Sequence, residues 1–67
     1  MTRRKANSRA RELFGRKAFV FTGEEGYPCY VSDGTKVDGW AVMVGFGDTW
    51  EEALAVAEAY LVPKETT

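Results

Sequence analysis

Apolar residues recur along this chain with two different spacings, which predict a helix, three strands and a second helix. In residues 3–14 they follow the i, i+4, i+7, i+8 pattern of one helical face. These residues are Ala6, Ala10, Leu13 and Phe14. Arg4 and Arg11 fall on the opposite side, and Gly15 is a natural stop just after the last apolar position. The first element is therefore a predicted amphipathic helix with a basic outer side.

The middle of the chain is rich in aromatic and β-branched residues, which favour strands. Residues 18–22 and 27–32 flank a polar loop with two glycines, so we expect a hairpin. Pro28 lacks an N–H group, which places it at an edge strand or at the beginning of the second strand. Residues 33–39 are expected to form a longer turn. Residues 40–46 are the third predicted strand.

Side chains along a strand alternate between the two faces of the sheet, so the third strand divides into two sets. The longer apolar set is the better core candidate and consists of Trp40, Val42, Val44 and Phe46. Phe19 and Phe21 share one side of the first strand. Together with Tyr30 they are the candidates for a sheet face that the helices leave uncovered.

The last helix has the clearest sequence signature. Asp48 or Thr49 is the expected cap. Thr49 and Glu52 fit a capping box, in which the hydroxyl accepts from a first-turn amide and the glutamate reaches back. A continuous apolar stripe follows at Trp50, Ala53, Leu54, Ala57, Tyr60 and Leu61. Val62-Pro63 is expected to end the helix, because the residue before proline leaves the α region.

These elements predict an α+β fold with both helices packed on one face of a three-stranded antiparallel sheet. The 67 residues suffice for a single small domain, residues 1–67. Its two ends, residues 1–5 and 64–67, are expected to be loose.

Charge is divided between two parts of the chain. Residues 1–17 hold seven of the nine basic residues and one acid, a balance of +6. Residues 18–67 hold the other two basic residues and nine acids, a balance of −7. A basic segment of this kind meets an anionic surface or folds back on its own acidic body. Its candidate contacts, which we call the basic arm, are Arg3, Arg4, Lys5, Arg9 and Arg11.

Few residues are suited to catalysis or metal binding. The chain has no histidine, the commonest general base and transition-metal ligand. Cys29, the single cysteine, is expected to be a small core residue. Asp33 and Asp38 lack the spacing of a calcium loop, and acids after Gly45-Phe46-Gly47 would repel a phosphate. We therefore expect no enzyme activity, cofactor or metal.

Cysteine content and hydropathy bear on location. A secreted domain of this size would usually carry several disulfides, so one cysteine favours a reducing cytoplasm. No apolar run of signal-peptide length follows the basic N-terminus, and residues 40–44 are too short to span a bilayer. Membrane association is not expected.

The element order, with a third strand that runs through Gly47 into a capped helix, resembles the double-stranded RNA-binding domain. The Gly47-x-Thr49-x-x-x-Ala53 opening of that helix is similar as well. That family carries a lysine cluster there to hold phosphates, whereas this chain has Trp50-Glu51-Glu52. The resemblance implies the fold without the RNA-binding activity. Residues 47–57 also resemble the strand-to-helix segment of HicB-type antitoxins, which implies an antitoxin-like partner of a small toxin.

The leading hypothesis is a small regulator or inhibitor that docks on another protein, such as one that handles nucleic acid. Its size and charge separation suit a product of a mobile element. The expected protein contacts are Phe19, Phe21, Tyr30, Glu51, Glu52 and Glu58. One alternative is nucleic-acid binding through the basic arm; another is the antitoxin-like role. Self-association is left open.

Overall fold

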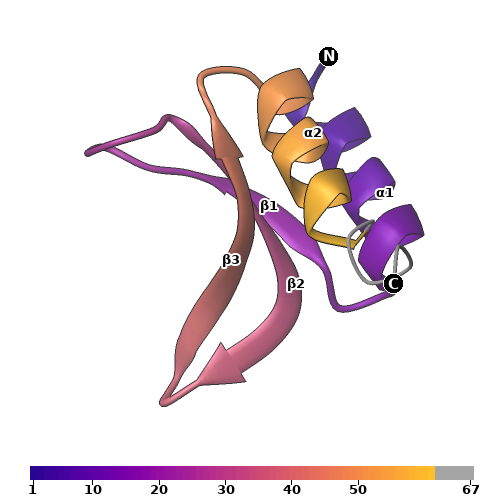
Figure 1. Cartoon of the computed structure of the whole chain (residues 1–67), viewed down its shortest axis with the longest axis vertical. Helices are drawn as coiled ribbons and strands as arrows, with labels where there is room; N and C mark the ends of the chain where they lie inside the picture. The colour runs from indigo at the N-terminus through magenta and orange to yellow at the C-terminus, as the bar shows by residue number, and fades with distance from the viewer. Residues whose placement is uncertain (62–67) are drawn as a thin grey trace.

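The computed structural model describes residues 1–61 and has the predicted order of elements (Figure 1). The elements are α1 (Arg3–Phe14), β1 (Phe19–Thr22), β2 (Cys29–Val37), β3 (Trp40–Gly47) and α2 (Trp50–Leu61). The predicted α+β fold is therefore confirmed. The expected helix stop at Val62-Pro63 and the expected loose end at 64–67 lie outside the described residues.

The three strands form one antiparallel sheet in the order β1-β2-β3. The two helices lie side by side over one face of this sheet, as predicted (Figure 1). The core lies between these two layers and is built mostly of small side chains. Its buried members are Ala6, Ala10, Ala18, Val20, Cys29, Val31, Val44, Ala53, Leu54 and Ala57. Small residues let the helices approach the sheet closely.

Helix α1 spans the predicted residues, and a threonine hydroxyl caps the start of each helix. The Lys5 N–H donates to Thr2 Oγ1 at the start of α1, and Gly15 ends it with a φ of +110°. At the start of α2 the Glu52 N–H donates to Thr49 Oγ1 over 3.1 Å. Glu52 Oε1 accepts from the Asp48 N–H over 3.0 Å, one residue before the cap. The capping box is confirmed.

The prediction of a long turn over residues 33–39 is wrong. Strand β2 continues through this stretch to Val37, with an irregularity in its pairing between Ser32 and Lys36. The turn is only Asp38-Gly39, and both residues have positive φ values, +53° and +84°. A two-residue turn with positive φ at both positions matches the twist of the strands that it connects. The Asp-Gly pair in the sequence indicates this tight hairpin.

The predicted inward set on the third strand is also wrong in large part. Ser32 pairs with Met43, but Val31 pairs with Gly45, so Val44 is an extra residue that forms a β-bulge. The bulge breaks the alternation of side chains, and both Val44 and Gly45 are buried. Phe46 is 42% exposed and Trp40 79% exposed. Only Val44 of the expected set is core, with Val42 packed partly against it.

Candidate interaction surface

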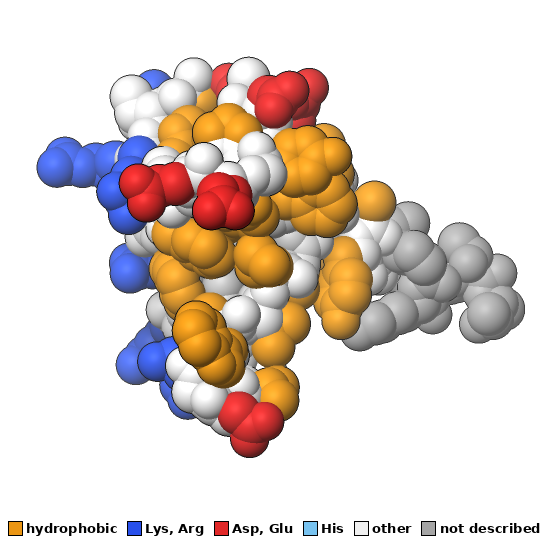
Figure 2. Space-filling model, turned by 90° about the vertical axis from the view of Figure 1, so that its left-hand side faces the viewer, with side chains coloured by type: hydrophobic (Ala, Val, Ile, Leu, Met, Phe, Trp, Pro, Cys, Tyr) orange, Lys and Arg blue, Asp and Glu red, His pale blue; other side chains and the backbone are white. Residues whose placement is uncertain are grey.

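The sheet face that lies away from the helices carries a band of hydrophobic side chains (Figure 2). The register explains why. Val20 and Val31 are paired and buried under the helices, so the neighbouring pair Phe21 and Tyr30 points to the other side. We call this side the open face; its large residues are Phe19, Phe21, Tyr30, Met43 and Phe46. The predicted placement of Phe19, Phe21 and Tyr30 on an uncovered face agrees with this register.

Three rings of the open face contact one another across β1 and β2. The ring centroids of Phe19 and Phe21 are 5.7 Å apart, and those of Phe21 and Tyr30 are 5.2 Å apart and stacked. The Tyr30 hydroxyl donates to the Glu25 carbonyl and accepts from the Tyr27 N–H, each over 3.2 Å. These bonds fix the Tyr30 ring before any partner arrives.

The open face extends beyond the predicted residues. Phe46 lies opposite Tyr30 in the sheet and packs against the Tyr27 ring, with centroids 4.7 Å apart. Met43 lies opposite Ser32 and is 53% exposed. Strand alternation alone assigns Phe46 and Met43 to opposite faces. Only the bulge at Val44 brings them to the same side.

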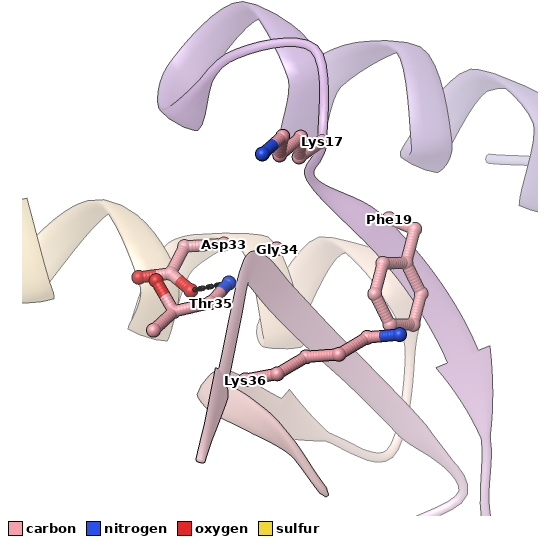
Figure 3. Close-up of a pocket in the computed structure, with 6 residues that line it drawn as sticks. All are labelled: Lys17, Phe19, Asp33, Gly34, Thr35 and Lys36. Atoms are coloured by element: carbon pink, nitrogen blue, oxygen red, sulfur yellow. Dashed lines mark hydrogen bonds between the residues drawn. The ribbon is translucent and has the colours of Figure 1, made fainter. Parts of the chain in front are cut away.

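A polar hollow lies at one border of the open face, between the start of β1 and the irregular part of β2 (Figure 3). Lys17 and Lys36 both line it; the Lys36 amino group lies at the Phe19 ring, whereas that of Lys17 points away from the ring. At the base of the hollow, the Thr35 N–H donates to Asp33 Oδ1 over 2.8 Å. A side chain at Gly34 would meet the Lys17 backbone, so only glycine fits at this position. The hollow places the positive charge of Lys36 beside an aromatic ring.

The basic arm lies along α1, and its members do not act alike. The Arg9 guanidinium donates to Glu12 Oε1 over 3.0 Å and to Glu58 Oε1 of α2 over 3.4 Å. Hydrogen bonds to Glu12 and then Glu58 raise the pKa of Arg9. Arg9 is thus directed to the chain's own acidic body. Within residues 1–61 the other four make no ion pair; they are Arg3, Arg4, Lys5 and Arg11.

The three acids predicted as protein contacts are engaged within the chain. Glu58 pairs with Arg9, and Glu52 completes the cap of α2. The Met1 amino group lies 3.0 Å from Glu51 Oε2, and this contact lowers the pKa of Glu51. All three help to hold α1, α2 and the cap together, so the sheet is the stronger candidate surface.

The structure also places the residues considered for chemistry. Cys29 is a core residue, as predicted, and burial raises the pKa of its thiol, with Asp48 and two glutamates adding to the effect. A thiol with a raised pKa is a poor nucleophile. Within residues 1–61 no three histidine, cysteine, aspartate or glutamate side chains are grouped to hold a metal ion. No helix in that range is long and apolar enough to cross a membrane.

Comparisons with known proteins give no match to any family model, curated protein or solved structure. The resemblances to the double-stranded RNA-binding domain and to HicB-type antitoxins therefore stay predictions. The functional argument rests on the surface of this chain alone.

Proposed function

We propose that this chain is a non-enzymatic binding protein that docks on another protein through its open face and modulates that partner. The observation that carries this proposal is the contact cluster of Phe19, Phe21 and Tyr30 on a face that neither helix covers. Aromatic side chains anchor protein interfaces because they bury much area and lose little rotamer freedom. The fixed Tyr30 ring reduces that entropic cost further.

The border of the open face defines the chemistry of the proposed partner. Lys36 lies beside Phe19, with Lys17 across the hollow, and basic side chains follow one side of the hydrophobic band (Figure 2). A complementary surface would have an apolar centre with carboxylates next to it. A regulator or inhibitor of a nucleic-acid-handling protein remains the leading form of this proposal.

Substituting Phe21 tests the proposal. Phe21→Ser removes the central ring of the cluster and should weaken partner binding at least about tenfold, with a small change in thermal unfolding, because the ring is half-buried. A photo-crosslinking aromatic residue at position 21 should join the chain to one discrete protein in extracts of its source cells. The purified partner then allows affinities to be compared by titration calorimetry.

The control places the same crosslinker at Ala59, an exposed position of α2. It should yield no discrete product. Equal crosslinking from both positions, or undiminished affinity of Phe21→Ser, would show that the open face is not the docking surface. Since the crosslinker keeps an aromatic ring at position 21, its readout stands even if the serine variant unfolds.

Nucleic-acid binding is a second candidate, favoured by four basic-arm side chains that make no ion pair within residues 1–61. Such side chains are available to neutralise phosphates, the main source of affinity for nucleic acid. In this case Arg4→Gln with Arg11→Gln should abolish most retention of labelled DNA or RNA in low salt. Wild-type affinity should fall steeply with salt, by a slope of about 0.9 per phosphate contact on duplex DNA.

The matched control is Ala55→Glu with Ala59→Glu, which changes the net charge by the same amount on the exposed side of α2. It should retain more binding than the arginine variant. A wild-type chain that shows no retention in filter binding at low salt removes this second candidate.

A further inference from the structure

The two edge strands of the sheet differ in how far the rest of the chain protects their outer backbone groups. Strand β1 is short, and its Val20 N–H donates to the Asn7 side chain of α1 over 3.1 Å. This N–H points away from β2, so helix α1 supplies the acceptor that a further strand would otherwise provide. The β1 edge is covered.

Strand β3 forms the other edge, and apart from the bulge at Val44 it has no such protection. Its eight residues, Trp40–Gly47, include no charged side chain and no proline. Natural edge strands usually carry a lysine or a proline, or remain short, because a row of unpaired N–H and C=O groups recruits further strands. Within residues 1–61 only β2 pairs with β3. Its outer row of backbone groups is therefore available.

Exposed apolar side chains gather around this same edge. On β3 itself, Trp40 is 79%, Met43 53% and Phe46 42% exposed. Val56 of α2, the helix that packs most extensively on β3, is 39% exposed. An open groove lies beside the end of β3, lined by Tyr27, Phe46, Gly47, Asp48, Glu52 and Val56. A single chain leaves this apolar surface in water.

We propose that the β3 edge is a homodimer interface, on which a second copy of this chain pairs antiparallel through its own β3. The two strands would join two three-stranded sheets into one continuous sheet with all four helices on one side. A two-fold axis makes the same patch serve both partners.

The chemistry of the strand favours a second copy over another partner. Like charges opposite one another destabilise paired strands, and β3 has none to oppose. At its margins Val56 and Phe46 of each copy would leave water, next to Asp48 and Glu52 of the same groove. A different partner chosen by charge would find nothing to recognise on this strand.

Dimerisation of this kind is independent of the proposed protein docking but would strengthen it. The open faces of two copies would lie on one sheet, so a partner with two sites would bind with higher apparent affinity.

Met43→Lys tests the dimer, because the residue lies in the middle of β3 and its side chain is largely exposed. In sedimentation equilibrium the wild type should approach twice its monomer mass of 7.5 kDa as concentration rises. Met43→Lys should remain monomeric over the same range, with a dissociation constant raised at least about tenfold, since two lysines would meet near the axis. At concentrations too low for the wild type to dimerise, the wild type and Met43→Lys should unfold at similar temperatures.

Thr22→Lys is the control, since it adds the same charge at the exposed end of the covered edge strand. It should dimerise like the wild type. Amide hydrogen exchange adds a measurement without substitution: β3 amides should gain protection with concentration, while that of Val20 stays unchanged. A wild type that stays monomeric, or a Met43→Lys variant that dimerises normally, would overturn the proposal and leave β3 to a strand of another protein.

Discussion

Replacing Leu54 with alanine should lower the free energy of unfolding by about 2–5 kcal/mol. Leu54 is 4% exposed and packs between the helices and the sheet. Most other buried core residues are alanine or valine, which are too small to fill the cavity that the substitution leaves. The total free energy of unfolding of a small domain is about 5–15 kcal/mol. The variant should therefore melt far below the wild type.

Thermal and urea unfolding followed by circular dichroism would measure this loss. Val56→Ala, an apolar truncation at an exposed position of the same helix, is the control and should change stability by less than about 0.5 kcal/mol. An unchanged midpoint for Leu54→Ala would mean that the stripe of α2 faces solvent.

The second large effect is expected at Gly45, where a single methyl group should disrupt the packing of α2 on the sheet. A Cβ atom at this position would meet the Ala53 carbonyl oxygen and would lie 2.8 Å from Ala57 Cβ. The first obstacle is helix backbone, which cannot rotate aside as a side chain can. Gly45→Ala should therefore cost about 1–3 kcal/mol or more.

The same unfolding measurements apply, with amide exchange in α2 as a local readout. Met43→Ala in the same strand is the control, because its side chain is exposed and its loss should cost less than about 0.5 kcal/mol. If Gly45→Ala melts like the wild type, α2 does not lie directly on β3.

The helices were predictable because their signals are local. The spacing of Ala6 and Ala10, the stop at Gly15 and the cap at Thr49 each depend on residues within a few positions of one another. Helical periodicity and capping follow from hydrogen bonds between near neighbours. These elements could therefore be predicted without reference to tertiary contacts.

The sheet could be predicted only up to its irregularities. The strand alternation of Phe19 and Phe21 holds, but the bulge at Val44 exchanges the sides of the residues that follow it. A bulge depends on the register that two strands adopt together, and here that register shifts twice between the tight turn at Asp38-Gly39 and the pair of Val31 with Gly45. Reading this Asp-Gly pair as a hairpin would have lengthened the second strand correctly.

For the candidate surfaces, too, local patterns were predictable and contacts between distant residues were not. Parity along β1 and β2 was sufficient to find the ring cluster of the open face. The pairing of Arg9 with Glu58 joins residues far apart in the chain, and the unequal protection of the two sheet edges depends on how α1 docks. Such contacts exist only once the fold has formed.

The hydrogen bond between Asn7 and Val20 gives α1 a second role, which limits how far the helix can move. The helix carries the positive charge of the chain on its outer side, and its inner side shields the border of β1. A ligand that drew the helix away by its charge would also uncover that border and separate Arg9 from Glu58. A ligand that binds the helix where it lies would leave both contacts in place.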